Sequence, residues 1–184
     1  MAKFHDFPSI ILDVRGNPGG YDWLSTWFAS HFVASPFPIY SLQFRTEGDS
    51  FLNQEMLPAI SGEAYPAYQG KIYEGDVYIL VDELCFSATD TFLNILCNAI
   101  SNRLTLVGRP NAAGIGGPAQ VDTLNQTGMT VTLSLCKAFD TASKQLLEGH
   151  PEHIHHHIHW TRQDILNDRD PDLEKALELI RKTN

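Results

Sequence analysis

The chain has 184 residues, which is enough for one ordinary domain with a hydrophobic core of its own. Its formal net charge of −9 disfavours nucleic acids and anionic membranes as partners, because they carry charge of the same sign. No apolar run reaches the roughly 18 residues that span a bilayer. Three cysteines without C-x-x-C spacing indicate neither a disulfide framework nor a zinc site.

Hydrophobic periodicity and turn residues predict strands that alternate with helices. The first half of the chain is predicted to contain a buried strand at residues 10–14, a turn at 16–20, a helix at 21–32, a strand at 39–45 and a surface excursion at 46–75. A buried strand at 76–81, a helix starting at 87 and a buried strand at 104–107 follow. The last part is predicted to form a hairpin of 121–124 with 129–139, an irregular histidine-rich stretch at 148–160 and a terminal helix at 170–182. This order predicts a layered α/β domain over residues 1–184. Because a core strand begins within nine residues of Met1, we expect the domain to be the C-terminal part of a longer protein.

The junction after the first strand carries the sequence Asp13-Val-Arg-Gly-Asn-Pro-Gly-Gly20. Adjacent glycines let a backbone turn freely and approach a ligand closely. They also leave N–H groups at the start of the following helix, and such groups are what an oxyanion hole requires. A strand-to-helix turn without a catalytic task fits the same residues equally well.

The junction after the strand at 76–81 carries Val81-Asp-Glu-Leu-Cys-Phe-Ser-Ala-Thr-Asp90. Ser87 is predicted to lie where a strand ends and a helix begins, beside the positive end of the helix dipole. This position suits a nucleophile whose transition state develops negative charge. Taken without the first junction, an ordinary N-cap serine is the preferred interpretation, with Asp90 three residues later completing a capping box.

Together the two junctions resemble the C-terminal-processing (tail-specific) and tricorn-core serine peptidases. The first junction is similar to that family's D-x-R-x-N-x-G-G segment, and the second to its nucleophile segment. Their order and separation agree, as do the Leu-Val-Gly-Arg-Pro strand that follows and the Asp-Pro-Asp-Leu-Glu-Lys-Ala-Leu ending. The resemblance therefore covers nearly the whole chain.

The resemblance implies a ClpP/crotonase-like core of repeated ββα units that hydrolyses peptide bonds through an acyl-enzyme. Ser87 would be the nucleophile, and the N–H groups of Gly19 or Gly20 and of Ala88 would form the oxyanion hole. The implied substrate is a peptide or an unfolded protein, and no cofactor or metal is expected. Relatives are usually extracytoplasmic or periplasmic.

The general base is where this chain departs from the family pattern. Tail-specific members use a lysine in a G-K-G context, but Ile115 stands at the corresponding position. Tricorn-like members use an upstream histidine that a glutamate orients, and Glu148 stands about where that glutamate falls. The partner histidine would precede this chain, since His5 is too close to the first strand to be a good substitute.

The tract from His150 to His159 also suggests metal binding, because alternation at His155, His157 and His159 suits one face of a strand. Structural or solvent-exposed histidines are the preferred interpretation, with adventitious or functional metal binding as alternatives. For the whole chain, the alternatives to a peptidase are a non-catalytic module that binds peptides or hydrophobic ligands, and a crotonase-like enzyme that handles acyl-CoA. Neither alternative needs a serine at position 87.

Overall fold

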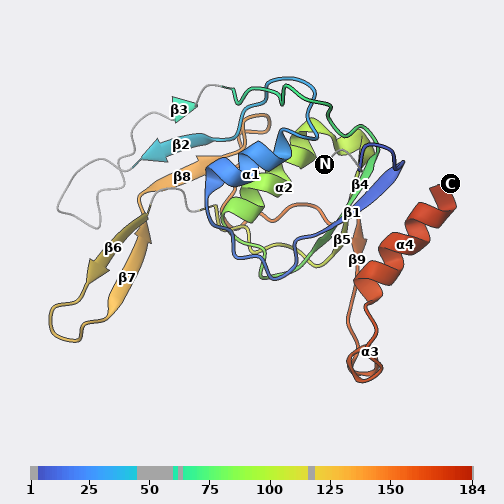
Figure 1. Cartoon of the computed structure of the whole chain (residues 1–184). Helices are drawn as coiled ribbons and strands as arrows, with labels where there is room; N and C mark the ends of the chain where they lie inside the picture. The colour runs from blue at the N-terminus through green and yellow to red at the C-terminus, as the bar shows by residue number, and fades with distance from the viewer. Residues whose placement is uncertain (1–3, 45–59, 62–63, 116–118, 184) are drawn as a thin grey trace.

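The computed structural model describes residues 4–44, 60–61, 64–115 and 119–183. At its centre is a parallel sheet with the strand order β1–β4–β5–β9 (Figure 1). Its members are β1 (Ser9–Asp13), β4 (Asp76–Val81), β5 (Leu104–Gly108) and β9 (His156–His157). The three predicted strands are confirmed, but only β4 and β5 are buried: β1 lies at one edge of the sheet and is half-buried, and the histidine tract adds a short strand at the other edge.

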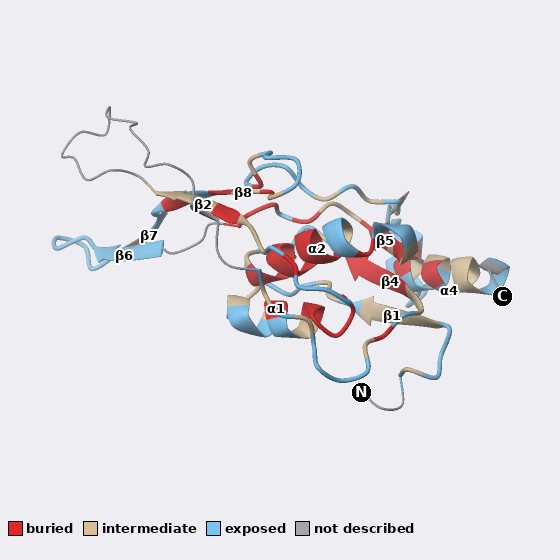
Figure 2. Ribbon diagram, turned by 90° about the horizontal axis from the view of Figure 1, so that it is seen from above, coloured by how far each residue is buried: buried red, intermediate tan, exposed pale blue. Residues whose placement is uncertain are grey.

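Helices cover both faces of this sheet. Helices α1 (Asp22–Ala29) and α2 (Ala88–Ala99) pack on one face and against each other, and α4 (Pro171–Thr183) packs on the other face (Figure 2). Two short elements, the 3-10 turn Ser101–Arg103 and α3 (Arg162–Leu166), complete the connections. Strand β4 lies between two neighbours and two layers of helices, so five of its six residues are buried.

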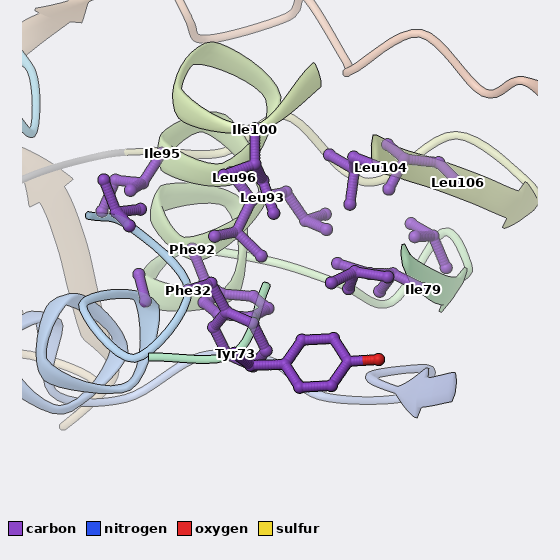
Figure 3. Close-up of a cluster of buried hydrophobic side chains, with 14 of the residues drawn as sticks. Phe32, Tyr73, Ile79, Phe92, Leu93, Ile95, Leu96, Ile100, Leu104 and Leu106 are labelled. Atoms are coloured by element: carbon purple, nitrogen blue, oxygen red, sulfur yellow. The ribbon is translucent and has the colours of Figure 1, made fainter. Parts of the chain in front are cut away.

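The main core lies between the sheet and the two helices α1 and α2 (Figure 3). Phe92, Leu93 and Leu96 of α2 are almost fully buried there against Ile79 and Leu106 of the central strands. These side chains repeat at helical spacing on α2 and at alternate positions on the strands, as burial on one face requires. This packing fixes the start of α2, where Ser87 lies.

A second, antiparallel sheet has the order β3–β2–β8, formed by Ile60–Ser61, Ser41–Phe44 and Cys136–Phe139. The strands β6 (Ala119–Thr123) and β7 (Thr130–Ser134) form a separate ribbon that extends away from the body of the molecule (Figure 1). Nearly every residue of this ribbon is exposed. The predicted hairpin is thus confirmed, although its second strand is divided between the ribbon and the second sheet.

The prediction of a layered α/β domain is confirmed, whereas the similarity to ClpP and crotonases stays a prediction. Aromatic side chains at and near the start of α1 lie largely outside the core: Tyr21, Trp23 and Trp27 are exposed by 75%, 65% and 43%. Helix α1 buries Thr26 and Ala29, and its Phe28 stacks, partly buried, on Phe92 of α2. No helix in the described ranges is both long and apolar enough to cross a membrane.

Candidate active site

The two junctions singled out in the sequence meet at one edge of the central sheet. Strands β1 and β4 are parallel neighbours, with Asp13 opposite Leu80, so the loops at their carboxyl ends lie side by side. The Gly16 N–H donates to Asp82 Oδ1 at 2.9 Å, and the Phe86 N–H donates to the Asn17 carbonyl at 3.2 Å. These bonds hold the glycine turn against the segment that carries Ser87.

Gly19 makes the closest approach between the two loops. A Cβ atom on Gly19 would lie 2.5 Å from Phe86 O, 2.7 Å from Ala88 N and 2.8 Å from Ser87 Cβ. Gly19 also has a φ of +92°, which side chains other than glycine rarely adopt. Only glycine therefore allows the first loop to touch the backbone on both sides of Ser87.

Ser87 has a strained backbone, with φ 58° and ψ −119°. A positive φ is uncommon for residues other than glycine, and the strain costs on the order of 1–3 kcal/mol. The expected N-cap role is wrong in its simple form, because the Ser87 side chain makes no capping hydrogen bond. Its hydroxyl is therefore not used to stabilise the helix.

Two backbone N–H groups beside Ser87 are available to a ligand. The Gly19 N–H donates to Asn17 Oδ1 at 2.9 Å, so it is already engaged. The N–H groups of Gly20 and Ala88 have no acceptor among the described residues. Ala88 is the first residue of α2, where the helix dipole favours negative charge.

A pocket of about 360 Å³ opens beside these N–H groups. Apolar side chains of α1 and α2 form most of the pocket wall, so the pocket suits an apolar side chain of a ligand. Its lining residues are Val14, Asn17, Gly19, Gly20, Tyr21, Leu24, Ser25, Trp27, Phe28, Ala88, Thr89 and Phe92. Tyr21, which is largely exposed, therefore forms part of the pocket wall.

Asp22 fixes the two helices that form this pocket. Its carboxylate accepts hydrogen bonds from the Thr91 hydroxyl of α2 at 3.2 Å and from the Tyr40 hydroxyl at 2.8 Å. Burial, followed by the neighbouring Asp22 charge, raises the pKa of Tyr40 well above its usual value. Tyr40 is therefore a neutral hydroxyl donor throughout the physiological range.

Asp90 holds a third loop in place. Its buried carboxylate accepts hydrogen bonds from Asn111 Nδ2 and from the Gly114 N–H, both at 2.7 Å. Burial raises the pKa of Asp90, and the hydrogen bonds oppose that increase. Asp90 therefore joins the start of α2 to the loop before Ile115, a role beyond the expected capping box.

Arg15 stabilises the outer side of the glycine turn through ion pairs with three carboxylates. Its guanidinium binds Asp13 and Asp170 at 2.7 Å and Asp172 at 3.0 Å. The hydrogen bond from Arg15 is the main cause that lowers the pKa of both Asp13 and Asp170. The first loop is thereby tied to the N-terminus of α4.

The structure brings no general base to Ser87 within the described ranges. No hydrogen bond there involves the Ser87 hydroxyl. Ile115, at the lysine position of the tail-specific pattern, is buried with Ala138 and Leu147. Glu148 is exposed, in a turn next to Gly149, whose N–H donates to the carbonyl of Ala113 in the loop that Asp90 holds.

His5 does not supply a base either. It lines a different cavity of about 220 Å³, with Phe4, Ile10, Ile11, Leu12, Phe28, Phe32 and Tyr73. Its Nδ1 atom is buried without a hydrogen-bond partner among the described residues. This cavity shares only Phe28 with the pocket beside Gly20 and Ala88.

Three residues that organise the site were not assigned roles from the sequence: Asn17, Asp82 and Asn111. Asp82 comes directly after β4, and Asp13 is the last residue of β1; this similar placement could have suggested that Asp82 binds the neighbouring turn. Asn17 and Asn111 act through contacts that depend on the folded loops. The partner of Asn111, for example, is 21 residues away in the chain.

Comparison with known proteins agrees with this geometry. The model of peptidase family S41 matches residues 1–158. This chain belongs to peptidase family S41.

Solved structures share the fold of this S41 chain. A Parabacteroides merdae protein has a TM-score of 0.81 at 24% identity, over 97% of this chain and 53% of its own. Mature CPAF in complex with lactacystin has a TM-score of 0.80 at 16% identity, over 99% and 45%. The tricorn protease has a TM-score of 0.61 at 17% identity, over 96% and 15%. The S41 chain thus spans about half the length, or less, of these relatives.

Proposed function

We propose that this chain carries the nucleophile and the oxyanion hole of a serine peptidase. The observation that carries the proposal is the strained backbone of Ser87, which directly precedes Ala88 and packs against Gly19, while the N–H groups of Gly20 and Ala88 have no acceptor in the described ranges. Strain of this kind is retained where function requires it. Membership of peptidase family S41 supports the same reaction class.

In this mechanism the Ser87 oxygen attacks the carbonyl carbon of a peptide bond while a base takes the hydroxyl proton. The carbonyl oxygen becomes negatively charged and accepts hydrogen bonds from the Gly20 and Ala88 N–H groups. Donors already oriented toward such an oxygen are worth about 2.7–4 kcal/mol each. The peptide C–N bond then breaks, the amine leaves with the proton, and water hydrolyses the ester on Ser87.

Gly19 has a separate role in this proposal. Its own N–H is engaged by Asn17, so it supplies close packing, and Gly20 supplies the donor. The apolar pocket beside both residues takes a side chain of the peptide. Substrates with an apolar residue next to the cleaved bond therefore fit better than charged ones.

For the base, we propose a Ser–His–Glu arrangement in which Glu148 orients a histidine that lies outside residues 1–184. The buried Ile115 speaks against a Ser–Lys dyad. Glu148 is exposed next to the loop that Asp90 holds, and is therefore accessible to a further segment. The limited coverage of the structural relatives is compatible with such a segment.

A non-catalytic module that binds peptides is the second candidate function. The buried Ile115 and the Ser87 hydroxyl without a hydrogen-bond partner in the described ranges favour it. The apolar pocket alone would be sufficient for such a role.

A fluorophosphonate serine probe, followed by peptide mass mapping, separates the two candidates. The probe is applied to this chain and to a longer form of the protein, with Ser87→Ala as the matched control. We expect labelling at Ser87 in the longer form and its loss in Ser87→Ala. A folded longer form that is not labelled but binds peptides with unchanged affinity after Ser87→Ala would support the binding module instead.

A further inference from the structure

Six of the eight histidines lie between residues 150 and 159, and the proposed peptidase mechanism uses none of them. Five of these histidines are exposed, and four of the five form two pairs. The ring centroids of His153 and His155 are 5.7 Å apart, and those of His157 and His159 are 4.4 Å apart. The histidines expected to alternate along one strand face therefore form two separate pairs.

The chain between the two pairs is irregular. The His155 N–H donates to the Leu106 carbonyl, and the Ile158 N–H donates to the Gly108 carbonyl. In a regular parallel strand such donors are two residues apart, whereas here they are three apart. As a result Ile154 packs into the core beneath α1 and α2, whereas Ile158 packs against α4 on the opposite face.

The two pairs differ in the nitrogen atoms that they can offer. The Leu106 N–H donates to Nδ1 of His155 at 2.9 Å. A neutral His155 ring consequently carries its proton on Nε2 and has no lone pair left for a metal ion. No hydrogen bond within the described ranges engages a ring nitrogen of His157 or His159.

The spacing of His157 and His159 suits two ligands of one ion. Zinc–nitrogen bonds are about 2.0–2.1 Å long, so two imidazoles on a tetrahedral ion have ring centroids roughly 5 Å apart. The observed 4.4 Å is close to this separation, and small rotations of two exposed side chains cover the difference. Residues i and i+2 of an extended chain point to the same side.

We propose that His157 and His159 bind one divalent transition-metal ion, such as Zn²⁺ or Cu²⁺. No group of three or more His, Cys, Asp or Glu side chains in the described part of the chain could hold a metal. Water molecules therefore complete the coordination, and the site is open. Imidazole ligands favour copper and zinc over the hard ions Mg²⁺ and Ca²⁺, which prefer oxygen.

The net charge of −9 attracts cations to the protein, which supports binding at an exposed site. The bound ion would also link the end of β9 to the segment that leads into α3. His157 is opposite Gly108 in the sheet, whereas His159 lies beyond the strand. Since the ion binds the folded arrangement, it raises the melting temperature.

The test is isothermal titration calorimetry of the tag-free, metal-free chain with Zn²⁺ and Cu²⁺, with Mg²⁺ as the comparison ion. We expect one bound ion per chain and tighter binding of Cu²⁺ than of Zn²⁺. The variants His157→Ala and His159→Ala should each weaken binding by about tenfold or more. The matched variants His153→Ala and His155→Ala should change it by less than about twofold, because the lone pair of His155 is occupied.

Equal loss of affinity in the His153→Ala variant would overturn the assignment, as would Mg²⁺ binding of similar strength or no saturable binding of Zn²⁺ and Cu²⁺. Circular dichroism confirms that each variant is folded, which is expected because all four side chains are exposed. Imidazole resonances in NMR provide an independent measurement. Cu²⁺ should broaden those of His157 and His159 before those of His153.

Discussion

Gly19 and Ser87 are 68 residues apart in the chain, yet a Cβ atom on Gly19 would lie 2.8 Å from the Cβ of Ser87. The two loops beside the nucleophile therefore pack against each other with no room for a side chain. Four predictions test the structural basis of the candidate site.

Gly19→Ala should destabilise the protein by about 2–4 kcal/mol, because the new methyl group meets both the Phe86 carbonyl and the Ala88 N–H in addition to backbone strain. Gly16→Ala is the matched control. Its φ is also positive, +69°, but nothing lies within 4 Å of its Cβ position. Urea unfolding measures both changes, and equal losses in the two variants would contradict the close packing.

Ser87→Gly should be more stable than Ser87→Ala by roughly 1 kcal/mol, since glycine relieves a positive φ that alanine retains. Both variants should lose labelling by the serine probe. Comparison of their urea midpoints provides the measurement. An alanine variant as stable as the glycine variant would show that the Ser87 backbone is not strained.

Ile115→Lys should not create a Ser–Lys dyad. The new ammonium group would have to enter the cluster that Ile115 forms with Ala138 and Leu147, at a cost of several kcal/mol. Ile115→Met is the control of similar volume and should cost less than about 1.5 kcal/mol. Gain of hydrolysis in a folded Ile115→Lys variant would contradict this prediction.

Acid should weaken the link between the glycine turn and α4. The hydrogen bonds from Arg15 lower the folded-state pKa of Asp13 and Asp170 below the ordinary value of an aspartate. The two carboxylates therefore stabilise the fold fully at a pH above their unfolded-state pKa. This stabilisation is lost as the pH falls from the unfolded-state pKa through the lower folded-state pKa.

Asp170→Asn should reduce the unfolding free energy by about 1 kcal/mol at pH 7 and make its decline below pH 4 less steep. Asp168→Asn, a change at an exposed carboxylate nearby, is the control and should have little effect. Urea unfolding between pH 7 and pH 2.5 provides the measurement. The same acid dependence in wild type and Asp170→Asn would exclude this carboxylate as a cause.

The central strands could be predicted from the sequence because continuous apolar runs have few alternatives to a buried strand. The inward face of α1 could not be predicted in this way. Trp23 and Trp27 recur at helical spacing, just as the residues that are in fact buried do. Which stripe of a helix faces the core depends on the space that α2 leaves, and that space is set by contacts distant in the chain.

The position of Ser87 at the start of a helix was predictable, but its backbone was not. Positive φ is normally announced by glycine, and nothing in the neighbouring sequence requires it at a serine. The bond from Asp90 to Gly114 was equally inaccessible, because it depends on how two loops fold over each other.

The ribbon of β6 and β7 has a consequence for the behaviour of the protein at high concentration. Neither outer edge pairs with another strand in the described part of the chain, so each presents free backbone N–H and C=O groups. Residues 119–134 contain a single charged residue, Asp122, and no lysine or proline, the residues that commonly prevent strands from pairing edge to edge. Aggregation of this protein should therefore begin at the ribbon while the domain is still folded.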